Sequence, residues 1–193
     1  MALAGLILPL ARTSADEVYV CGYDGPLQKF SSGGVASLVT TNLSGQDGPI
    51  GLVCDNVGNV YAGEPSSSTI WRFSPEGTTF VAGFPDDSVS GLAFDTTGIL
   101  YATIPNYTAL VLPDYVSGKY SVSGFTAGTG GLPYPVTLAL DSSNSVYVAN
   151  NTNADPFPFP SNPSPYDNTI QKFAYGPSNF TRLGTFASGL NCP

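Results

Sequence analysis

Three stretches of the chain share one pattern, and that pattern predicts the fold. "LVCDNVGNVYAGEP" begins at Leu52, "LAFDTTGILYATIP" at Leu92 and "LALDSSNSVYVANN" at Leu138. Each reads as a short apolar strand, an aspartate, a polar turn and a second short strand with alternating apolar residues. This order predicts an antiparallel hairpin that recurs along the chain.

The hairpin belongs to a longer repeat. Its second strand carries a tyrosine at Tyr19, Tyr61, Tyr101 and Tyr147, so successive tyrosines lie 42, 40 and 46 residues apart by subtraction. A period of about 40–50 residues is typical of propeller blades of four strands. We therefore expect an all-β fold, a β-propeller built from four-stranded antiparallel blades, with about four repeat units. A single β-propeller or propeller-fragment domain would span 1–193, with repeat units at 9–48, 49–88, 89–134 and 135–193.

The start of the chain has two interpretations. "PLARTSADEVYV" from Pro9 aligns without a gap over "TLALDSSNSVYV" from Thr137, which predicts a first strand near Leu10 and places Thr13 where the other units carry aspartate. The apolar run "MALAGLILPLA" followed by "TSA" is also similar to a secretory signal, although it lacks a basic start and contains a proline. Residues 1–15 are thus either built into the sheet or cleaved.

Aspartates end the first strand of three units and are expected to shape the following turn. Their carboxylates can accept hydrogen bonds from backbone N–H groups two or more residues on, and glycine or asparagine favours the positive φ that the turn needs. We interpret these residues as scaffold rather than as a ligand cluster: Asp55, Asp95 and Asp141, with Gly58, Gly98 and Asn144.

Aromatic and basic residues recur at fixed repeat positions. The aromatic set is expected to fill the core between sheets: Tyr19, Tyr61, Tyr101, Tyr147, Phe30, Trp71, Phe73, Phe84, Phe94, Phe125, Phe173 and Phe186. The basic residues Lys29, Arg72 and Lys172 are expected to point to solvent and protect strand edges.

Composition excludes several kinds of function. Six basic and 14 acidic residues give a formal charge of −8, which disfavours a nucleic-acid partner. The chain contains no histidine, so imidazole bases and histidine metal sites are excluded.

No apolar run reaches the roughly 20 residues of a membrane span. Cys21, Cys54 and Cys192 show no CxxC spacing, and we expect buried thiols, with one disulfide as the alternative.

The fourth unit, "LALDSSNSVYVANN" continued by "NTIQKFA", resembles the NHL-repeat family of β-propellers. The resemblance covers nearly all of the chain and is strongest from Pro49 to Phe94 and from Pro135 to Phe173; the third unit departs from it with "ALVLP". A looser resemblance extends to gluconolactonase-type six-bladed propellers, which implies a calcium or zinc ion held by Glu, Asn and Asp at the central opening. Streptogramin lyases of the same shape rely on a histidine, which this chain lacks.

Polar residues at the expected mouth of the channel are the candidate binding residues. Loops between second and third strands usually line this mouth, and they contain Asp24, Glu64, Asn106, Asn150 and Asn151. Oxygen ligands from several loops suit a hard cation, so calcium at Asp24, Glu64, Asn106 and Asn150 is one hypothesis. A solvated polar rim without any cofactor is the other.

The fourth unit also contains a proline-rich insertion at 152–167. Alternation of proline with Phe157, Phe159 and Tyr166 favours an extended path and presents rigid apolar side chains. These residues either cover their own blade or contact a partner or a sister subunit.

Three functional hypotheses follow. The first is a non-catalytic, secreted or cell-surface NHL-like propeller that binds a protein partner, or copies of itself, through its mouth loops and the insertion. The second is a metal-dependent, lactonase-like hydrolase that uses Glu64 and Asp24 with Asn106 or Asn150. The third is a structural subunit that forms homo-oligomers by sharing strands.

Overall fold

The computed structural model describes residues 10–12, 17–21, 26–40, 43, 49–84, 88–104, 107–113, 120–125, 132, 135–150, 168–175 and 180–190. The chain divides into two compact units, Met1–Val89 and Ser90–Pro193. Within the described ranges no residue is helical, and no helix long and apolar enough to cross a membrane occurs there. The prediction of an all-β chain is therefore confirmed.

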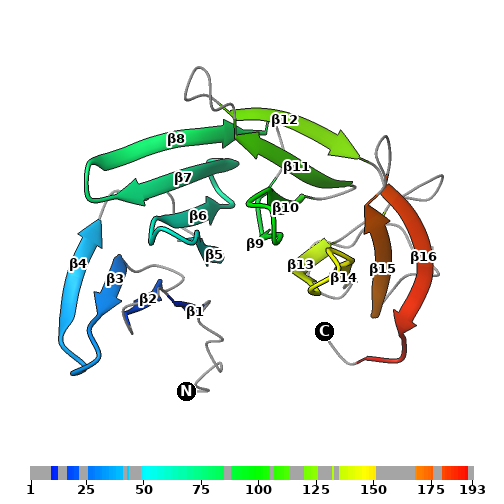
Figure 1. Ribbon diagram of the computed structural model, residues 1–193, viewed down its shortest axis with the longest axis horizontal. Coiled ribbons are helices and arrows are strands. Elements are labelled where there is room, and N and C mark those ends of the chain that lie inside the picture. The colour runs from blue at the N-terminus through cyan, green and yellow to red at the C-terminus, as the bar shows by residue number, and fades with distance from the viewer. Residues whose placement is uncertain are drawn as a thin grey trace. The chain divides into compact units, whose positions relative to one another are not determined.

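Each unit holds two antiparallel four-stranded sheets whose strands follow chain order (Figure 1). In the first unit, sheet 1 comprises β1 (Leu10–Arg12), β2 (Val18–Val20), β3 (Leu27–Phe30) and β4 (Ala36–Thr40), and sheet 2 comprises β5 (Gly51–Cys54), β6 (Val60–Glu64), β7 (Thr69–Ser74) and β8 (Gly77–Gly83). In the second unit, sheet 3 comprises β9 (Gly91–Phe94), β10 (Leu100–Ile104), β11 (Tyr107–Pro113) and β12 (Tyr120–Phe125), and sheet 4 comprises β13 (Pro135–Leu140), β14 (Val146–Asn150), β15 (Thr169–Tyr175) and β16 (Phe180–Ala187).

The first strand of sheet 1 lies where the repeat alignment predicts it. β1 pairs with β2 in the antiparallel register Leu10 with Val20 and Ala11 with Tyr19. Sheet 4 has the equivalent pairing, with Leu138 opposite Val148. The structure thus builds part of the 1–15 segment into the sheet.

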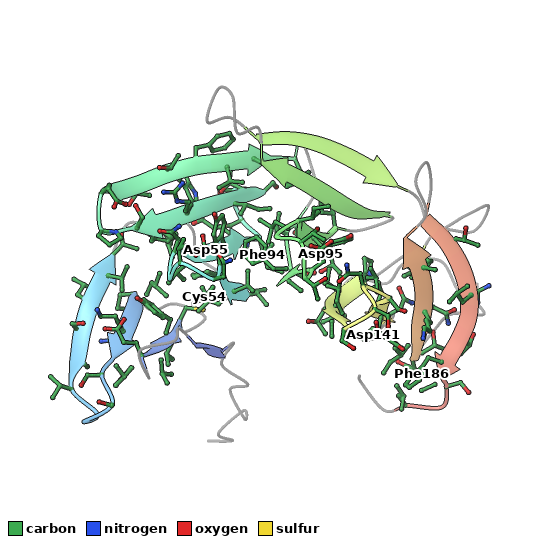
Figure 2. The ribbon with its side chains drawn as sticks, viewed as in Figure 1. Cys54, Asp55, Phe94, Asp95, Asp141 and Phe186 are labelled. Carbon is green, nitrogen blue, oxygen red and sulfur yellow. The ribbon has the colours of Figure 1, made fainter. Side chains whose placement is uncertain are left out.

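The aspartate turns form as predicted (Figure 2). Asp95 Oδ1 accepts hydrogen bonds from Thr97 N at 2.8 Å and from Ile99 N at 2.9 Å. The residue that closes each turn has positive φ, 90° at Gly98 and 60° at Asn144. Equivalent bonds hold the turns at Asp55 and Asp141. The three aspartates are scaffold.

Replacing Asp95 by alanine is expected to lower the free energy of unfolding by about 1–2 kcal/mol, because one half-buried backbone N–H group, that of Ile99, and one exposed group, that of Thr97, lose a charged acceptor. Asp95→Asn, which keeps one carbonyl oxygen, is the matched control and should lose less than half as much. Urea unfolding of the three proteins measures the difference. Equal losses for both variants would show that the turn does not depend on an acceptor at this position.

The same aspartates also hold the tyrosines of the second strands. Tyr147 Oη lies 3.1 Å from Asp141 Oδ2, and Lys172 lies opposite Tyr147 in the register of β14 and β15. The Lys172 ammonium sits 4.9 Å from the centre of the tyrosine ring and 3.8 Å from Asp141 Oδ2. The side chains of Lys29 and Lys172 are 35% and 31% exposed, so they reach solvent as predicted, but each also pairs with a carboxylate. The prediction that Lys29, Arg72 and Lys172 protect strand edges is wrong, because β3, β7 and β15 are inner strands of their sheets.

Sheet 1 makes this cluster with a different acid. Glu17, just before β2, accepts a hydrogen bond from Lys29 Nζ at 2.9 Å and one from Tyr19 Oη at 3.4 Å. Glu17 thus contacts the tyrosine and the lysine of its sheet, as Asp141 does in sheet 4. The sequence repeat that forms sheet 1 carries Thr13 at the aspartate position, and Glu17, before β2, contacts its tyrosine and lysine instead.

Apolar side chains pack between the two sheets of each unit. In the first unit Tyr19, Cys21 and Leu27 of sheet 1 pack with a buried set from sheet 2: Leu52, Val60, Ala62 and Phe73. In the second unit Tyr101 of sheet 3 packs with Leu132 and a buried set from sheet 4: Leu138, Val146, Val148 and Phe173.

Most of the predicted core aromatics are buried or half-buried, with one exception. Phe186 is 63% exposed, because it lies on the face of sheet 4 opposite the cluster around Tyr101, and its ring touches Tyr147 edge-on at 5.0 Å. The core prediction is wrong for Phe186. The side chain of Phe125 is outside the described part of the chain.

The two described cysteines are free thiols, as expected. Cys21 is fully buried and donates to the carbonyl oxygen of Pro49 at 2.7 Å. Burial raises the pKa of Cys21 to about 12 and that of the half-buried Cys54 to about 11. Both thiols are therefore protonated and unreactive at neutral pH. Cys192 lies outside the described residues.

Candidate functional site

Glu64, the last residue of β6, has an unusual environment for a carboxylate. Its side chain is fully buried, with 0% exposure, and it lies opposite Thr69 in the register of β6 and β7. Glu64 Oε2 accepts hydrogen bonds from the hydroxyls of Ser67 and Thr69. Glu64 Oε1 has no hydrogen-bond donor among the described residues. The two oxygens of this buried carboxylate therefore differ: Oε2 accepts two hydrogen bonds, and Oε1 accepts none from the described residues.

The equivalent strand position in other sheets shows that packing does not require a charge here. β10 ends in Ile104 and β14 ends in Asn150, and both side chains are also 0% exposed. An isoleucine fills the position without any polar atom, whereas a buried carboxylate oxygen without a donor costs about 1–3 kcal/mol or more. Glu64 therefore lowers stability relative to an apolar residue unless something outside the described residues binds it.

A buried amide elsewhere shows how the fold treats polar groups that serve structure. Gln171 on β15 is also 0% exposed, but its Oε1 accepts from Arg182 Nε at 2.9 Å and Nη2 at 2.6 Å. Its Nε2 donates to the hydroxyls of Thr169 at 2.8 Å and Thr185 at 3.0 Å. Both ends of the Gln171 amide have hydrogen-bond partners, whereas Glu64 Oε1 has none among the described residues.

Asn168 lies at the end of sheet 4 that corresponds to the Glu64 end of sheet 2, and it was not among the predicted site residues. It precedes β15 with φ of 52°, as Ser68 precedes β7 with φ of 55°. Asn168 Oδ1 is buried and has no donor among the described residues. The alignment of "STIWRF" with "NTIQKF" pairs Ser68 with Asn168 and could have identified the position.

The structure places two of the eight predicted site residues. Glu64 belongs to the first unit and Asn150 to the second, and both are buried, so the solvated-rim interpretation does not hold for them. Six lie outside the described residues: Asp24, Asn106, Asn151, Phe157, Phe159 and Tyr166. Within the described ranges, no three His, Cys, Asp or Glu side chains gather to hold a metal ion.

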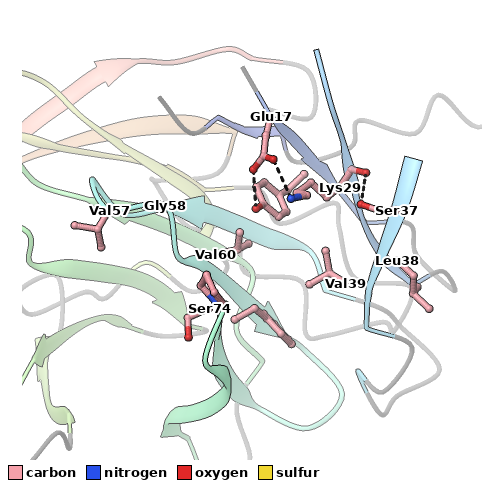
Figure 3. A pocket seen from close by; sticks show the side chains of 12 residues that line it. Glu17, Lys29, Ser37, Leu38, Val39, Val57, Gly58, Val60 and Ser74 are labelled. Carbon is pink, nitrogen blue, oxygen red and sulfur yellow. Dashed lines mark hydrogen bonds and ion pairs between the residues drawn. The ribbon is translucent and has the colours of Figure 1, made fainter. Parts of the chain in front are cut away.

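A hollow of about 540 Å³ lies in the first unit (Figure 3). It is lined by Val60, the first residue of β6, whereas Glu64 is the last residue of that strand. Its walls are Leu38 and Val39 of β4, Val57 in the β5–β6 turn, and Val60 and Phe73 of sheet 2. The charged residues among its described walls, Glu17 and Lys29, bond each other at 2.9 Å. Tyr19, Ser37 and Ser74 also line it, so the hollow has a mixed apolar and polar lining, and its charged residues form a neutral pair.

The chain matches no family model and no curated protein. Its structure is similar to a streptogramin B lyase, with a TM-score of 0.70, 14% identity, and coverage of 92% of this chain and 54% of the other. A gluconolactonase from Xanthomonas campestris gives a TM-score of 0.68 and 15% identity over 94% of this chain and 62% of its own. A catalytically inactive virginiamycin B lyase from Staphylococcus aureus, with one histidine replaced by alanine, gives 0.66 and 16% over 95% and 58%.

These similarities support a propeller-type fold. At 14–16% identity they are evidence for the fold alone. The chain spans between 54% and 62% of the length of these three structures. The histidine whose replacement inactivates the virginiamycin lyase has no counterpart in this chain, which contains none.

Proposed function

We propose that the chain is a non-catalytic NHL-like propeller module, secreted or displayed at the cell surface, that binds its ligand at the loop ends of its second strands. The observation that carries the proposal is the fully buried Glu64 carboxylate, whose Oε1 has no donor among the described residues. Asn168 Oδ1, at the equivalent end of sheet 4, is also buried without a donor among the described residues, and this supports the proposal. Buried acceptors that lack internal donors suit a ligand that brings donors or positive charge.

Calcium is the ligand class that fits Glu64 best. Carboxylate, hydroxyl and amide oxygens are the groups that hard cations prefer, and Glu64 Oε1 is an unused carboxylate oxygen beside the hydroxyls of Ser67 and Thr69. Glu64 would hold the ion, with further oxygens from neighbouring loops. The ion would neutralise the negative charge of the buried carboxylate. It would also order those loops for contact with a protein partner.

The protein partner would meet the same loops. We include the proline-rich insertion, 152–167, in this contact, because Phe157, Phe159 and Tyr166 offer rigid apolar side chains at low ordering cost. The formal charge of −8 argues against a nucleic-acid partner.

Calcium is expected to raise the melting temperature of the wild-type protein in proportion to the logarithm of its concentration above Kd, with a gain of about 2.7 kcal/mol at one hundred times Kd. Glu64→Gln should lose this response, and without calcium it should be at least as stable as wild type, because an amide costs less to bury than a carboxylate. Differential scanning calorimetry with and without calcium measures both effects.

Glu76→Gln is the matched control, since Glu76 lies exposed in the β7–β8 turn. It should keep the full calcium response. A wild-type protein whose melting temperature ignores calcium, or a Glu64→Gln variant that responds as strongly as wild type, would remove Glu64 from the proposed site.

A metal-dependent, lactonase-like hydrolase is the second candidate function. The observation that favours it is the same unsatisfied acid, in a chain whose fold is similar to that of a gluconolactonase. Turnover of a simple lactone that depends on added metal and disappears in Glu64→Gln would support it. Calcium binding without lactone turnover would leave the binding module as the function.

A further inference from the structure

Residues that are buried in sheets 2, 3 and 4 are half-exposed in sheet 1. The positions before and after the tyrosine of the second strand are between 0% and 1% exposed in the three later sheets: Val60 and Ala62, Leu100 and Ala102, Val146 and Val148. In sheet 1 the same two positions, Val18 and Val20, are only half-buried. Phe30, opposite Val18, is also half-buried, whereas Phe73 and Phe173 are 6% and 1% exposed.

In sheet 4 the more exposed residue is the tyrosine of the second strand, Tyr147. Tyr19, Tyr61 and Tyr101 are 8%, 5% and 0% exposed, but Tyr147 is half-exposed. Around it lie Ala139, which is exposed, Lys172, which is half-buried, and Phe186, which is 63% exposed. These four residues form the tyrosine flank of sheet 4. Val18, Val20, Gln28 and Phe30 form the valine flank of sheet 1.

Each unit contains one interface that joins flanks of these two kinds. In the first unit Tyr19 packs with Val60, Ala62 and Phe73, and in the second unit Tyr101 packs with Val146, Val148 and Phe173. The residues that cover a tyrosine are thus a pair of small apolar residues and a phenylalanine. The valine flank carries Val18, Val20 and Phe30, which are the same residue types that cover Tyr101.

We propose that a second copy of this chain docks its valine flank on the tyrosine flank of the first, head to tail. Apolar contact between the flanks supplies the driving force. Neither flank presents an unpaired charge: the valine flank is neutral, and Lys172, the charged residue of the tyrosine flank, is paired with Asp141 at 3.8 Å. The contact joins sheet faces, so it differs from strand sharing, which would use the outer strand edges.

This association is heterologous, because each contact uses one flank of each kind. Such contacts close into a ring if the rotation between copies allows it, and otherwise extend into longer arrays. The docking does not rest on the loop-end site, since no residue of either flank is Glu64 or Asn168.

Complementation between two blocked variants tests the proposal. Ala139→Arg blocks the tyrosine flank and Val20→Arg blocks the valine flank, and each variant alone is expected to sediment as a monomer where the wild-type chain associates. An equimolar mixture should recover a one-to-one dimer, because Ala139→Arg keeps a valine flank and Val20→Arg keeps a tyrosine flank. Analytical ultracentrifugation across the micromolar range measures the masses, and circular dichroism confirms that both variants fold.

Several results would overturn the docking. A wild-type chain that is monomeric throughout the range would do so, as would folded variants that fail to complement one another. Association of Val20→Arg alone would show that tyrosine flanks pair with each other instead. If either variant unfolds, Phe186→Arg and Val18→Arg take their places. Val57→Arg, at a position that is 79% exposed in the β5–β6 turn, should associate as wild type does.

Discussion

Replacing Phe173 by alanine is expected to lower the free energy of unfolding by about 3–5 kcal/mol. Phe173 is 1% exposed and packs against Tyr101, Leu138, Val146 and Val148 in the second unit. Removal of the ring loses its transfer free energy and leaves a cavity that β-sheet side chains, fixed by their register, fill poorly. A loss of this size approaches the whole stability of many domains.

Phe186→Ala in the same sheet is the matched control. Its ring is 63% exposed, so its removal should cost less than about 1.5 kcal/mol, mainly the edge contact with Tyr147. Chemical denaturation of dilute protein gives both values. Similar losses for the two phenylalanines would mean that the core does not lie on the face of sheet 4 that carries Phe173.

Gly91→Ala is expected to have the second large effect, a loss of about 3 kcal/mol. Gly91 begins β9, where β13 passes close by: a Cβ atom would lie 2.8 Å from Thr137 Cα, 2.8 Å from Thr103 Oγ1 and 3.2 Å from Leu138 N. Two of these neighbours are backbone atoms, which cannot turn aside as a flexible side chain can. The two strands must separate to admit a single methyl group.

Gly33→Ala separates this steric effect from the general effect of losing a glycine. At Gly33 the nearest atom to a new Cβ would be 3.8 Å away, which is an ordinary contact. This variant should match or slightly exceed wild-type stability, because alanine restricts the unfolded chain. Melting temperatures of both variants provide the comparison, and a Gly91→Ala protein as stable as Gly33→Ala would contradict the close approach of β9 and β13.

Local features of the fold could be predicted because their causes lie within a few residues. Asp95, Gly98 and Ile99 are close neighbours in sequence, and the turn needs only an acceptor, a positive φ and an N–H group. The two-residue alternation around Tyr147 likewise reveals which residues share a face. Repetition of these patterns was enough to predict four-stranded antiparallel sheets and the strand near Leu10.

Features that depend on distant neighbours could not be predicted from the same patterns. Alternation places Phe186 on a face, but it does not say whether another sheet covers that face. Glu17 replaces an aspartate from a different position in the repeat, so alignment alone misses it. Glu64 could be identified as a polar residue at a strand end, but its complete burial depends on packing by residues remote in the chain.

The substitution of Glu17 for the repeat aspartate has a mechanical consequence for the edge of sheet 1. In sheets 2, 3 and 4 the tyrosine hydroxyl reaches an aspartate that directly follows the first strand, so a side-chain contact tethers that strand to the second. Tyr19 instead contacts Glu17, which lies on the approach to β2. Among the described residues no such contact tethers β1 to β2, so we expect amide hydrogen exchange to begin at β1, ahead of the first strands of the other sheets.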